Sequence, residues 1–414
     1  MQWEKKRSDI LNVIKVAIDI PFYKETLKSV DTDLLTMEQF KDLPILYKKH
    51  IVGSEKMLLH PKYTEDSVYY EYTSGSTGNP LKCYKGIRER YIKTKDLWKF
   101  RKAYGNIRPQ DKYTMFYAFA EDDLSTDLIN EKENVLYLSM FDMSEEVLEM
   151  YYRKLIDYQA KWFFSVPSAL YIFSQFIKSK GYDPKVDLNL RYIELSGEVL
   201  FDDQRKLIEE VFQMPVYNHY GSREFWCLAM SCEYGHLHTL DNRFYFEIIN
   251  ERADGTGELV VTDLFNKQWP LIRYYLGDIV SFSNDICECG QRIFEVTGGR
   301  SQEYLQIEDW IANPILFHYI VMKINRQFGD VIRQFQVVQQ LEKSFVINIV
   351  PGIEMSNNIL GLFKTELFDR IPFRIDISFE ILEFIKFQGS KFKYFIPYEK
   401  EKVKWTTYIN KSEK

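Results

Sequence analysis

Hydrophobic residues recur at helical spacing at the start of the chain and again in later segments. Ile10, Val13, Ile14 and Ala17 lie three or four positions apart, which predicts an amphipathic helix that ends near Pro21. Similar spacing predicts helices over residues 87–104, 143–158, 168–178 and 202–212. Short hydrophobic runs between them predict strands over residues 161–166, 190–196 and 215–220. Alternation of strands with helices is typical of an α/β domain with parallel strand pairing.

The pattern changes near residue 244, where strands begin to follow one another directly. Strands are predicted over residues 244–249, 258–262, 279–282, 335–338, 345–350 and 376–381, with a helix over 359–368. We therefore predict the α/β fold class, with a large N-terminal α/β domain over residues 1–299 that contains parallel sheets and a β-rich part. A small α+β C-terminal domain over residues 300–414 follows on a hinge near Gly298-Gly299-Arg300.

Composition narrows the class of protein. The 414 residues are 45% hydrophobic and 28% charged, which is ordinary for a soluble globular protein. A net charge of −6 without a long Lys/Arg block argues against a nucleic-acid partner. No run of about 18 apolar residues predicts a membrane span, and the N-terminus lacks a secretory-type stretch. Five cysteines, an odd number, favour a reducing compartment, so we expect a cytoplasmic protein. A homodimer is left open.

A run of hydroxyl residues and glycines stands out between Tyr72 and Lys82. It reads Tyr-Thr-Ser-Gly-Ser-Thr-Gly-Asn-Pro-Leu-Lys and follows the aromatic, β-prone residues 68–72. Glycine backbone can approach and wrap a polyanion, so this loop suits the β- and γ-phosphates of a nucleotide. The run is not a Walker P-loop, which needs a different glycine spacing and leads into a helix. The alternative is a plain surface turn.

Further glycine-containing segments follow predicted strands. Ser196-Gly197-Glu198 could line a flat base, or it could be a helix entry with Asp202 as cap. In Tyr220-Gly221-Ser222-Arg223-Glu224, an aromatic ring could stack on a purine, glycine would permit close approach, and the final carboxylate could hold Mg²⁺. The alternative for this second segment is a strand-to-helix turn.

A third such segment, Arg273-Tyr274-Tyr275-Leu276-Gly277-Asp278, ends in a carboxylate. Asp278 could accept hydrogen bonds from two vicinal ribose hydroxyls. The alternative is an ordinary Gly-Asp hairpin turn. Gly299-Arg300 and Gly389-Ser390-Lys391 complete the series.

In this order and at these separations, the segments resemble those of the adenylate-forming superfamily, which includes acyl-CoA synthetases, peptide-synthetase adenylation domains and luciferases. The chain looks most like the phenylacetate–CoA ligase and CapK-like branch, from about Pro21 to Lys393. The resemblance implies a ligase that forms an acyl-adenylate from a carboxylate and ATP, and then transfers the acyl group to a thiol, usually of coenzyme A. It also implies that the small C-terminal domain rotates between the two half-reactions.

The resemblance also assigns roles to residues. The phosphate loop would be formed by Thr73, Ser74, Gly75, Ser76, Thr77, Gly78 and Lys82. The nucleotide would further be contacted by Gly197 and Glu198 on the adenine side, Tyr220 and Gly221 as the stacking segment, and Asp278 with Arg300 at the ribose. Catalysis would depend on Lys82, on Glu224 as the magnesium ligand, and on Lys391, whose ammonium would neutralise charge at the attacking carboxylate.

Two features depart from the family pattern. Ser301-Gln302-Glu303 stands at the presumed hinge, where the family usually shows acidic residues. Residues 111–140 lack the glycine-rich stretch common in phenylacetate–CoA ligases, which weakens any transfer of their substrate pocket to this chain. Lys393 is an alternative to Lys391, which is preferred because it lies closer to the glycine turn.

Four residues in one third of the chain could bind zinc. Cys232, His238, Cys287 and Cys289 provide three thiolates and one imidazole, a set that suits a tetrahedral structural Zn²⁺ site. His236 is the alternative imidazole, and Cys227 is excluded because it follows Glu224 too closely. The other interpretation is buried cysteines acting as small hydrophobes beside a solvent-facing histidine.

The sequence thus predicts an ATP-dependent, AMP-forming carboxylate ligase that uses Mg²⁺ and carries a structural Zn²⁺. Its substrate would be a small aromatic or otherwise apolar carboxylic acid, and coenzyme A the expected thiol co-substrate. One alternative is transfer to a phosphopantetheine carrier protein, as in siderophore or antibiotic assembly, or to another acyl acceptor. Another is a non-catalytic, zinc-stapled scaffold, against which the retention of Lys82, Glu224, Asp278 and Lys391 argues.

Overall fold

The computed structural model describes most of the chain. The described residues are 2–28, 30–32, 34–73, 80–117, 128–140, 142–300, 305–308, 310–312, 314–329, 331–352, 355–385 and 393–398. The helices are α1 (Gln2–Ala17), α2 (Met37–Lys41), α3 (Ile87–Gly105), α4 (Glu145–Tyr158), α5 (Pro167–Lys180), α6 (Pro184–Asp187), α7 (Asp202–Phe212), α8 (Ile315–Phe328) and α9 (Asn357–Phe368). Short 3₁₀ turns occupy Lys48–His50, Glu55–Leu58 and Glu65–Ser67.

The strands form one large sheet and several small ones. They are β1 (Tyr69–Tyr72), β2 (Lys82–Lys85), β3 (Tyr113–Tyr117), β4 (Ile129–Lys132), β5 (Val135–Ser139), β6 (Trp162–Ser165), β7 (Tyr192–Ser196), β8 (Val216–Ser222), β9 (Trp226–Ser231), β10 (Leu237–Thr239), β11 (Phe244–Ile249), β12 (Gly257–Asp263), β13 (Tyr274–Ile286), β14 (Arg292–Arg300), β15 (Leu305–Ile307), β16 (Trp310–Ala312), β17 (Ile332–Leu341), β18 (Ser344–Pro351), β19 (Asp376–Ile381) and β20 (Phe395–Ile396).

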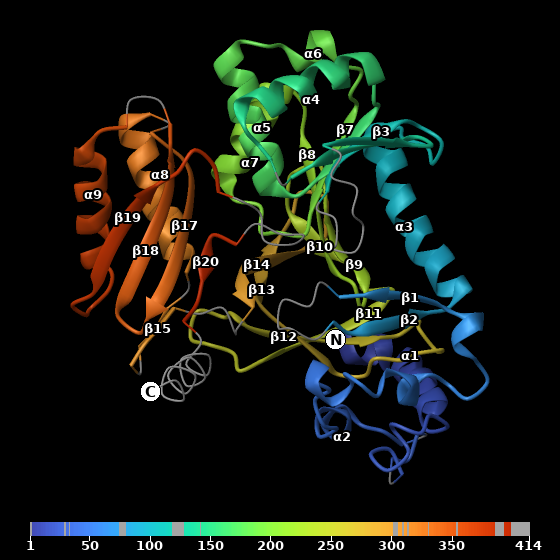
Figure 1. Cartoon of the computed structure of the whole chain (residues 1–414). Coiled ribbons are helices and arrows are strands. Elements are labelled where there is room, and N and C mark those ends of the chain that lie inside the picture. The colour runs from blue at the N-terminus through green and yellow to red at the C-terminus, as the bar shows by residue number, and fades with distance from the viewer. Residues whose placement is uncertain are drawn as a thin grey trace, which may run out of the picture.

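The large sheet joins the two halves that the hydrophobic pattern separates. Among the described residues it has 12 strands in the order β11-β12-β13-β14-β10-β9-β8-β7-β6-β3-β5-β4. Strands β8, β7, β6, β3 and β5 pair in parallel, while β4 at one edge and β9 to β14 on the other side pair antiparallel. The continuous run of strands is visible in Figure 1. The predicted α/β class, with parallel strands plus a β-rich part, is confirmed.

Helices α4, α5 and α7 cover the parallel half, and local sequence explains where they begin and end. Pro167 stands at the first turn of α5, and Gly181 ends that helix at a φ of 68°, which glycine adopts without strain. Asp202 is the first residue of α7 and not its cap, because Phe201 occupies the cap position. The strands beneath are buried on both faces, as parallel strands are: Phe163 is fully buried in β6.

The C-terminal part has its own sheet and core. Strands β19-β18-β17-β20 form a four-stranded sheet, against which α8 and α9 pack. The large part meets it where the His318 ring of α8 stacks on Phe201 at a centroid distance of 3.7 Å. His318 Nε2 also lies 3.0 Å from Asp203 Oδ1. The domain boundary at residues 299 and 300 and the rotation of the C-terminal part stay predictions.

Candidate functional site

The hairpin of β1 and β2 carries the hydroxyl-rich run. Its antiparallel register pairs Tyr72 with Lys82, and the ladder continues one residue further. The Thr73 N–H donates to the Leu81 carbonyl at 3.0 Å, and the Thr73 hydroxyl accepts the Leu81 N–H at 2.9 Å. Thr73 therefore holds the two ends of the run together. Ser74, Gly75, Ser76, Thr77 and Gly78 lie outside the described residues.

Lys82 is held by a carboxylate on the hairpin's outer side. Its Nζ lies 2.8 Å from Glu65 Oε1 and 4.0 Å from the centroid of the Tyr70 ring. The Glu65 carboxylate raises the pKa of Lys82. Lys56 and Lys82 in turn lower the pKa of Glu65 to about 2. The ammonium of Lys82 thus has an anionic partner already, and a phosphate would have to compete with Glu65 for it.

Tyr220 and Asp278, which are 58 positions apart in the sequence, are in direct contact. The Tyr220 hydroxyl donates to Asp278 Oδ2 at 2.5 Å, and the Tyr220 ring lies 5.6 Å from that of Phe294. Tyr220 stands near the carboxyl end of β8, the last strand of the parallel half. Ligands of α/β sheets collect at this edge, so the structure brings the predicted base-stacking ring and the predicted ribose carboxylate to one place.

Gly221 is required by the turn that follows β8. A Cβ at this position would lie 1.5 Å from the carbonyl oxygen of Trp226. Trp226 itself adopts a φ of 68°, an uncommon value for a residue other than glycine. The segment leads from β8 directly into β9, so the alternative of a strand-to-helix turn is wrong.

Glu224 lies in this β8–β9 turn and is buried, with 5% of its surface exposed. The hydroxyl of Tyr274, in β13, donates to Glu224 Oε1 at 2.9 Å. A carboxylate oxygen that is oriented in this way has the chemistry of a ligand for a hard cation such as Mg²⁺.

Asp278 does not lie in a hairpin turn. The Gly277-Asp278 pair lies inside the long strand β13, where the pairing register shifts next to Asp278. Gly277 adopts a φ of 78°, which permits a β-bulge there. The bulge re-aims the Asp278 side chain, and the hairpin-turn alternative is therefore wrong. The backbone of Asp278 pairs with that of Arg300 in β14. The Arg300 side chain lies outside the described part.

The Gly197-Glu198 turn follows β7 and contacts the start of α5. Gly197 has a φ of 90°, and Glu198 Oε2 accepts the backbone N–H of Ser168 at 3.1 Å. That N–H belongs to the first turn of α5, where a carboxylate is favoured by the helix dipole. Lys391, the predicted catalytic lysine, lies outside the described residues.

A network of buried charged side chains connects helix α3 to strands β7 and β8. Arg101 of α3 binds both oxygens of Glu194 at 2.8 Å each, and Glu194 Oε1 lies 3.3 Å from His219 Nδ1. Burial of His219 lowers its pKa, but Cys227 and Glu194 outweigh this and raise it to about 10. Sequence reasoning missed this network. It also missed Glu71 and Lys85, which join the hairpin to the β8–β9 turn and are described below.

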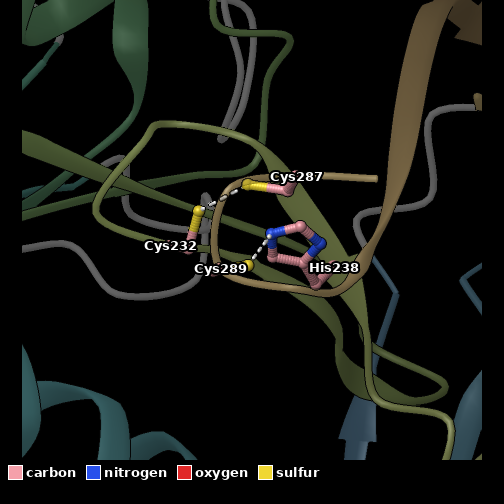
Figure 2. A group of neighbouring side chains, drawn as sticks. All are labelled: Cys232, His238, Cys287 and Cys289. Carbon is pink, nitrogen blue, oxygen red and sulfur yellow. Dashed lines mark hydrogen bonds between the residues drawn. The ribbon is translucent and has the colours of Figure 1, made fainter. Parts of the chain in front are cut away.

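The four predicted zinc ligands lie together, and we call them the Cys/His cluster: Cys232, His238, Cys287 and Cys289. Their ligand atoms all lie within 4.8 Å of one another. Cys232 Sγ lies 3.6 Å from Cys287 Sγ, and Cys289 Sγ lies 3.1 Å from His238 Nε2; both pairs face each other in Figure 2. His238 is 5% exposed, so the alternative of a solvent-facing histidine is wrong for it. His236, the other imidazole, lies 3.3 Å from Cys287 Sγ.

Two turns of the same design hold the cluster. In each, the cysteine N–H donates to the carbonyl four residues later, at 3.0 Å for Cys232 and 2.9 Å for Cys287. Gly235 and Gly290, three residues after these cysteines, donate back to the cysteine carbonyls and have φ values of 83° and 81°. The same residue pattern, Cys-Glu-x-Gly, occurs at both places. This repeated pattern could have predicted from the sequence that the two turns have the same structure.

The tautomer of His238 suits metal binding. Its Nδ1 lies 2.8 Å from the carbonyl oxygen of Arg292. A carbonyl can only accept, so Nδ1 carries the proton and Nε2 presents a lone pair to the cluster. Metal-ligating histidines are commonly oriented in this way. The donor set therefore fits a thiophilic ion of zinc type.

The chain is similar in sequence to proteins of known name. No family model matches the chain. It is 23% identical over 373 residues to Protein CapK of Staphylococcus aureus, covering 87% of this chain and 81% of CapK. It is 22% identical over 352 residues to phenylacetate-coenzyme A ligase of Thermus thermophilus, covering 78% and 74% of the two chains.

A solved structure shares the whole fold. 2-Hydroxyisobutyryl-CoA ligase in its postadenylation state has a TM-score of 0.73 and 16% identity, covering 98% of this chain and 91% of that one. For the same ligase in its thioesterification state the TM-score is 0.58. The chain has the fold of the adenylate-forming superfamily. Its resemblance to the phenylacetate–CoA ligase and CapK-like branch is confirmed. Every helix that the structure describes is too short or too polar to cross a membrane.

Proposed function

We propose that this chain is an ATP-dependent, AMP-forming ligase of a carboxylic acid. The contact of the Tyr220 hydroxyl with Asp278, beside the buried Glu224 at the carboxyl end of β8, carries the proposal. The names of similar proteins support it: one relative is a phenylacetate-coenzyme A ligase, and the structures of 2-hydroxyisobutyryl-CoA ligase hold R3-HIB-AMP in one state and 2-HIB-AMP with CoA in another.

In the proposed first half-reaction, the acid's carboxylate attacks the α-phosphorus of ATP, and pyrophosphate leaves. The Tyr220 ring would lie against the base, and Asp278 would accept the ribose hydroxyls. Such a displacement depends mainly on positioning and on neutralising charge. Glu224 would hold Mg²⁺, which supplies positive charge to the phosphates when bound. Lys391 would neutralise the attacking carboxylate.

The role proposed for Lys82 has to take account of its ion pair with Glu65. Its ammonium is paired with Glu65, and both groups lie on the outer side of the hairpin. Lys82 would reach a phosphate only by leaving Glu65, and solvent-exposed ion pairs of this kind are weak. We therefore keep Lys82 as a phosphate ligand that must exchange partners when the nucleotide binds.

In the proposed second half-reaction, a thiol attacks the acyl carbonyl and AMP leaves. Coenzyme A is the proposed thiol, because the comparison structures of the shared fold are CoA ligases by name. The acid is proposed to be aromatic or otherwise apolar. Trp162 and Phe163 are fully or almost fully buried in β6, so they belong to the core and do not line a pocket for it.

We further assign Zn²⁺ to the Cys/His cluster. Four protein ligands leave no open position for water, so the ion would cross-link the two turns and would not take part in the reaction. The cluster lies in the β9–β10 turn, on β10 and in the turn between β13 and β14. These strands belong to the sheet that also holds Tyr220 and Asp278.

The test is ATP–pyrophosphate exchange in the presence of Mg²⁺ with a panel of aromatic, aliphatic and hydroxy acids. Exchange that depends on one class of acid is the expected result. Absence of exchange with every acid, together with absence of MgATP binding in calorimetry, would refute the proposal and favour the scaffold alternative. Addition of coenzyme A or of a holo carrier protein to the active mixture then identifies the acceptor. Exchange that survives Lys391→Ala would refute the assignment of that lysine.

A further inference from the structure

A buried ion pair joins the phosphate-loop hairpin to the turn that carries Glu224. Lys85, at the end of β2, is only 1% exposed at its side chain, and its Nζ lies 3.0 Å from Glu71 Oε2 on the facing strand β1. The same ammonium donates to the carbonyl of Arg223. Residue 223 directly precedes Glu224, so one lysine contacts both the hairpin and the turn, which are 138 positions apart in the sequence.

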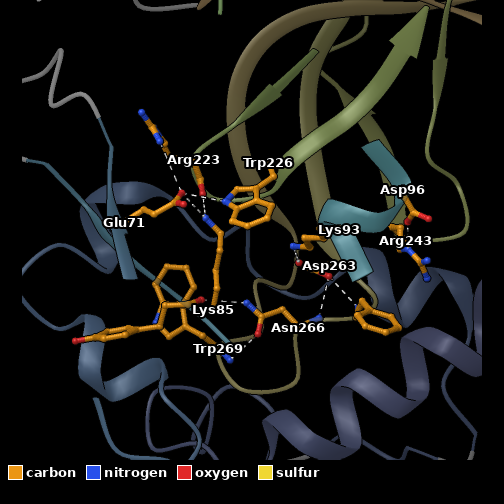
Figure 3. A network of polar contacts seen from close by, with 12 residues as sticks. Glu71, Lys85, Lys93, Asp96, Arg223, Trp226, Arg243, Asp263, Asn266 and Trp269 are labelled. Atoms are coloured by element: carbon orange, nitrogen blue, oxygen red, sulfur yellow. Dashed lines mark hydrogen bonds and ion pairs between the residues drawn. The ribbon is translucent and has the colours of Figure 1, made fainter. Parts of the chain in front are cut away.

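Trp226 contacts the same carboxylate from the other side of the turn. Its indole Nε1 donates to Glu71 Oε2 at 2.9 Å, and the Lys85 ammonium lies 5.0 Å from the indole centroid. Figure 3 shows Lys85 and Trp226 meeting at Glu71. The guanidinium of Arg223 adds a longer contact to Glu71 at 3.9 Å. Residues on both sides of Glu224 are thus connected to one oxygen atom of β1.

Burial and charge act on both partners: burial lowers the pKa of Lys85, against the opposing effect of Glu71. Burial alone would raise the pKa of Glu71, but the Lys85 ammonium and the Trp226 N–H outweigh it and lower the pKa. Lys85 is the buried partner, at 1% exposed against 32% for Glu71, so removal of Glu71 would leave a buried ammonium unpaired, which is costly. Trp226 also keeps an uncommon φ of 68°. Backbone of this type persists where surrounding contacts over-determine it, and it occurs most often near functional sites.

The geometry leads to a specific role, which rests on the proposed function. We propose that Glu71, Lys85 and Trp226 form a clamp that positions the hairpin relative to Glu224 and thereby sets the affinity for a nucleotide's β- and γ-phosphates. These are positioning residues: they act through the strands that flank the hydroxyl-rich run and through the turn that holds Glu224. The proposed adenosine contacts, Tyr220 and Asp278, bond to each other, and we expect them to change less than the phosphate contacts.

The proposal can be tested because the clamp should affect binding of the β- and γ-phosphates more than binding of adenosine. MgATP carries the β- and γ-phosphates, whereas AMP lacks them and would bind through its base, ribose and α-phosphate. Lys85→Met removes the ammonium at nearly constant volume. We expect the Kd of MgATP, measured by calorimetry, to rise about tenfold, the scale of a small misplacement of binding groups. The Kd of AMP should change less than twofold.

The chain offers a matched control. Lys93 of α3 is a lysine of similar burial that pairs with Asp263, with Nζ and Oδ2 2.8 Å apart and side chains 3% and 2% exposed; Glu71, the partner of Lys85, is more exposed at 32%. It appears in Figure 3 but does not contact the β8–β9 turn in any described hydrogen bond. Lys93→Met should lower thermal stability to a similar degree and leave the ratio of the two Kd values unchanged.

A milder variant covers the case in which Lys85→Met does not fold. Trp226→Phe keeps an aromatic ring but removes the N–H donor to Glu71, and we expect a threefold or greater loss of MgATP affinity with AMP binding unchanged. Equal changes for MgATP and AMP, or no change relative to Lys93→Met, would overturn the clamp. If the wild-type protein binds neither nucleotide, the proposed function fails instead, so the two failures are distinguishable.

Discussion

The Cys/His cluster and the nucleotide face, by which we mean Tyr220, Gly221, Glu224 and Asp278, are built in different ways. In the cluster, two short turns with identical backbone hydrogen bonds present their cysteines side by side. On the nucleotide face, the side chains come from β8, from the β8–β9 turn and from a bulge in β13, and they meet only because the sheet brings these strands together. Each turn of the cluster is shaped by local hydrogen bonds, although tertiary structure brings the two turns together from 55 positions apart. On the nucleotide face, tertiary structure also places each individual side chain. A change in one region should therefore affect different measurements from a change in the other.

The largest expected effect comes from breaking the cluster. Cys232→Ser should abolish stoichiometric zinc and lower the free energy of unfolding by on the order of 5 kcal/mol, because a closed metal site contributes its binding energy to folding. Metal analysis and denaturant unfolding with and without a chelator measure both. Cys227→Ser is the control, since Cys227 is also buried but bonds to the Ala229 carbonyl outside the cluster. Full zinc content in Cys232→Ser would contradict the assignment.

Next in size is the charged network behind the nucleotide face. Glu194→Gln removes the partner of Arg101 and should cost about 3–5 kcal/mol, because a buried guanidinium is left unpaired. The network also predicts a pH dependence. His219 has a folded-state pKa raised to about 10, above its unfolded value of about 6.5. Its contribution to stability is therefore complete below pH 6.5 and is lost as the pH rises toward 10.

Unfolding at a series of pH values checks this dependence. The wild-type protein should lose stability between pH 6.5 and 10, and Glu194→Gln should lose less over that range. Parallel curves for the two proteins would show that His219 is not stabilised in its charged form by Glu194.

Glu224→Gln should leave folding intact and reduce the reaction. The amide keeps the shape of the side chain and can still accept from Tyr274, but it lacks the charge that would hold Mg²⁺. We expect pyrophosphate exchange to fall about 100-fold, the usual scale for loss of one charge-stabilising group. Zinc content and unfolding midpoint should match those of the wild-type protein. A large drop in the midpoint would mean that Glu224 is mainly structural.

The smallest effect is expected at the contact that first indicated the site. Tyr220→Phe keeps the ring but removes the hydroxyl that orients Asp278. Loss of a hydrogen bond to a charged group costs about 1.5–3 kcal/mol at most, and solvent or ribose hydroxyls would replace part of it. AMP binding should weaken about fivefold in calorimetry. Unchanged binding would show that Asp278 needs no such orientation.

The sequence allowed most of the local structure to be predicted. The bounds expected for α7 and β19 coincide with those observed. Both segments have clear hydrophobic spacing within them and turn residues at their ends. The four cluster residues could also be named in advance, since thiols and imidazoles in two short glycine-containing segments restrict what they can bind. The alternative of a hairpin turn at Gly277-Asp278 was wrong, because a glycine with positive φ serves a bulge as well as a turn.

What could not be predicted are the partners of charged side chains. Lys82 follows a glycine-rich run and reads as a phosphate ligand, yet it pairs with Glu65. Lys85, three positions later, carries no motif and is the residue that connects the hairpin to the turn of Glu224. Alternation along β2 places the two lysines on opposite faces, but only the packing of other strands decides which face meets the site.

The sequence by itself determined many of the helices and strands, though not β3 to β5 or α8. It also determined the order of the glycine segments and the set of soft metal ligands, because these depend on spacing within a few residues. The tertiary structure decided that β13 bulges toward Tyr220, that one sheet joins the parallel and antiparallel halves, and that Glu71 receives Lys85 and Trp226. The contacts of Glu71 with Trp226 and of Tyr220 with Asp278 connect residues 155 and 58 positions apart. Their free energy comes from the burial and strand pairing of the whole domain, which no short stretch of sequence encodes.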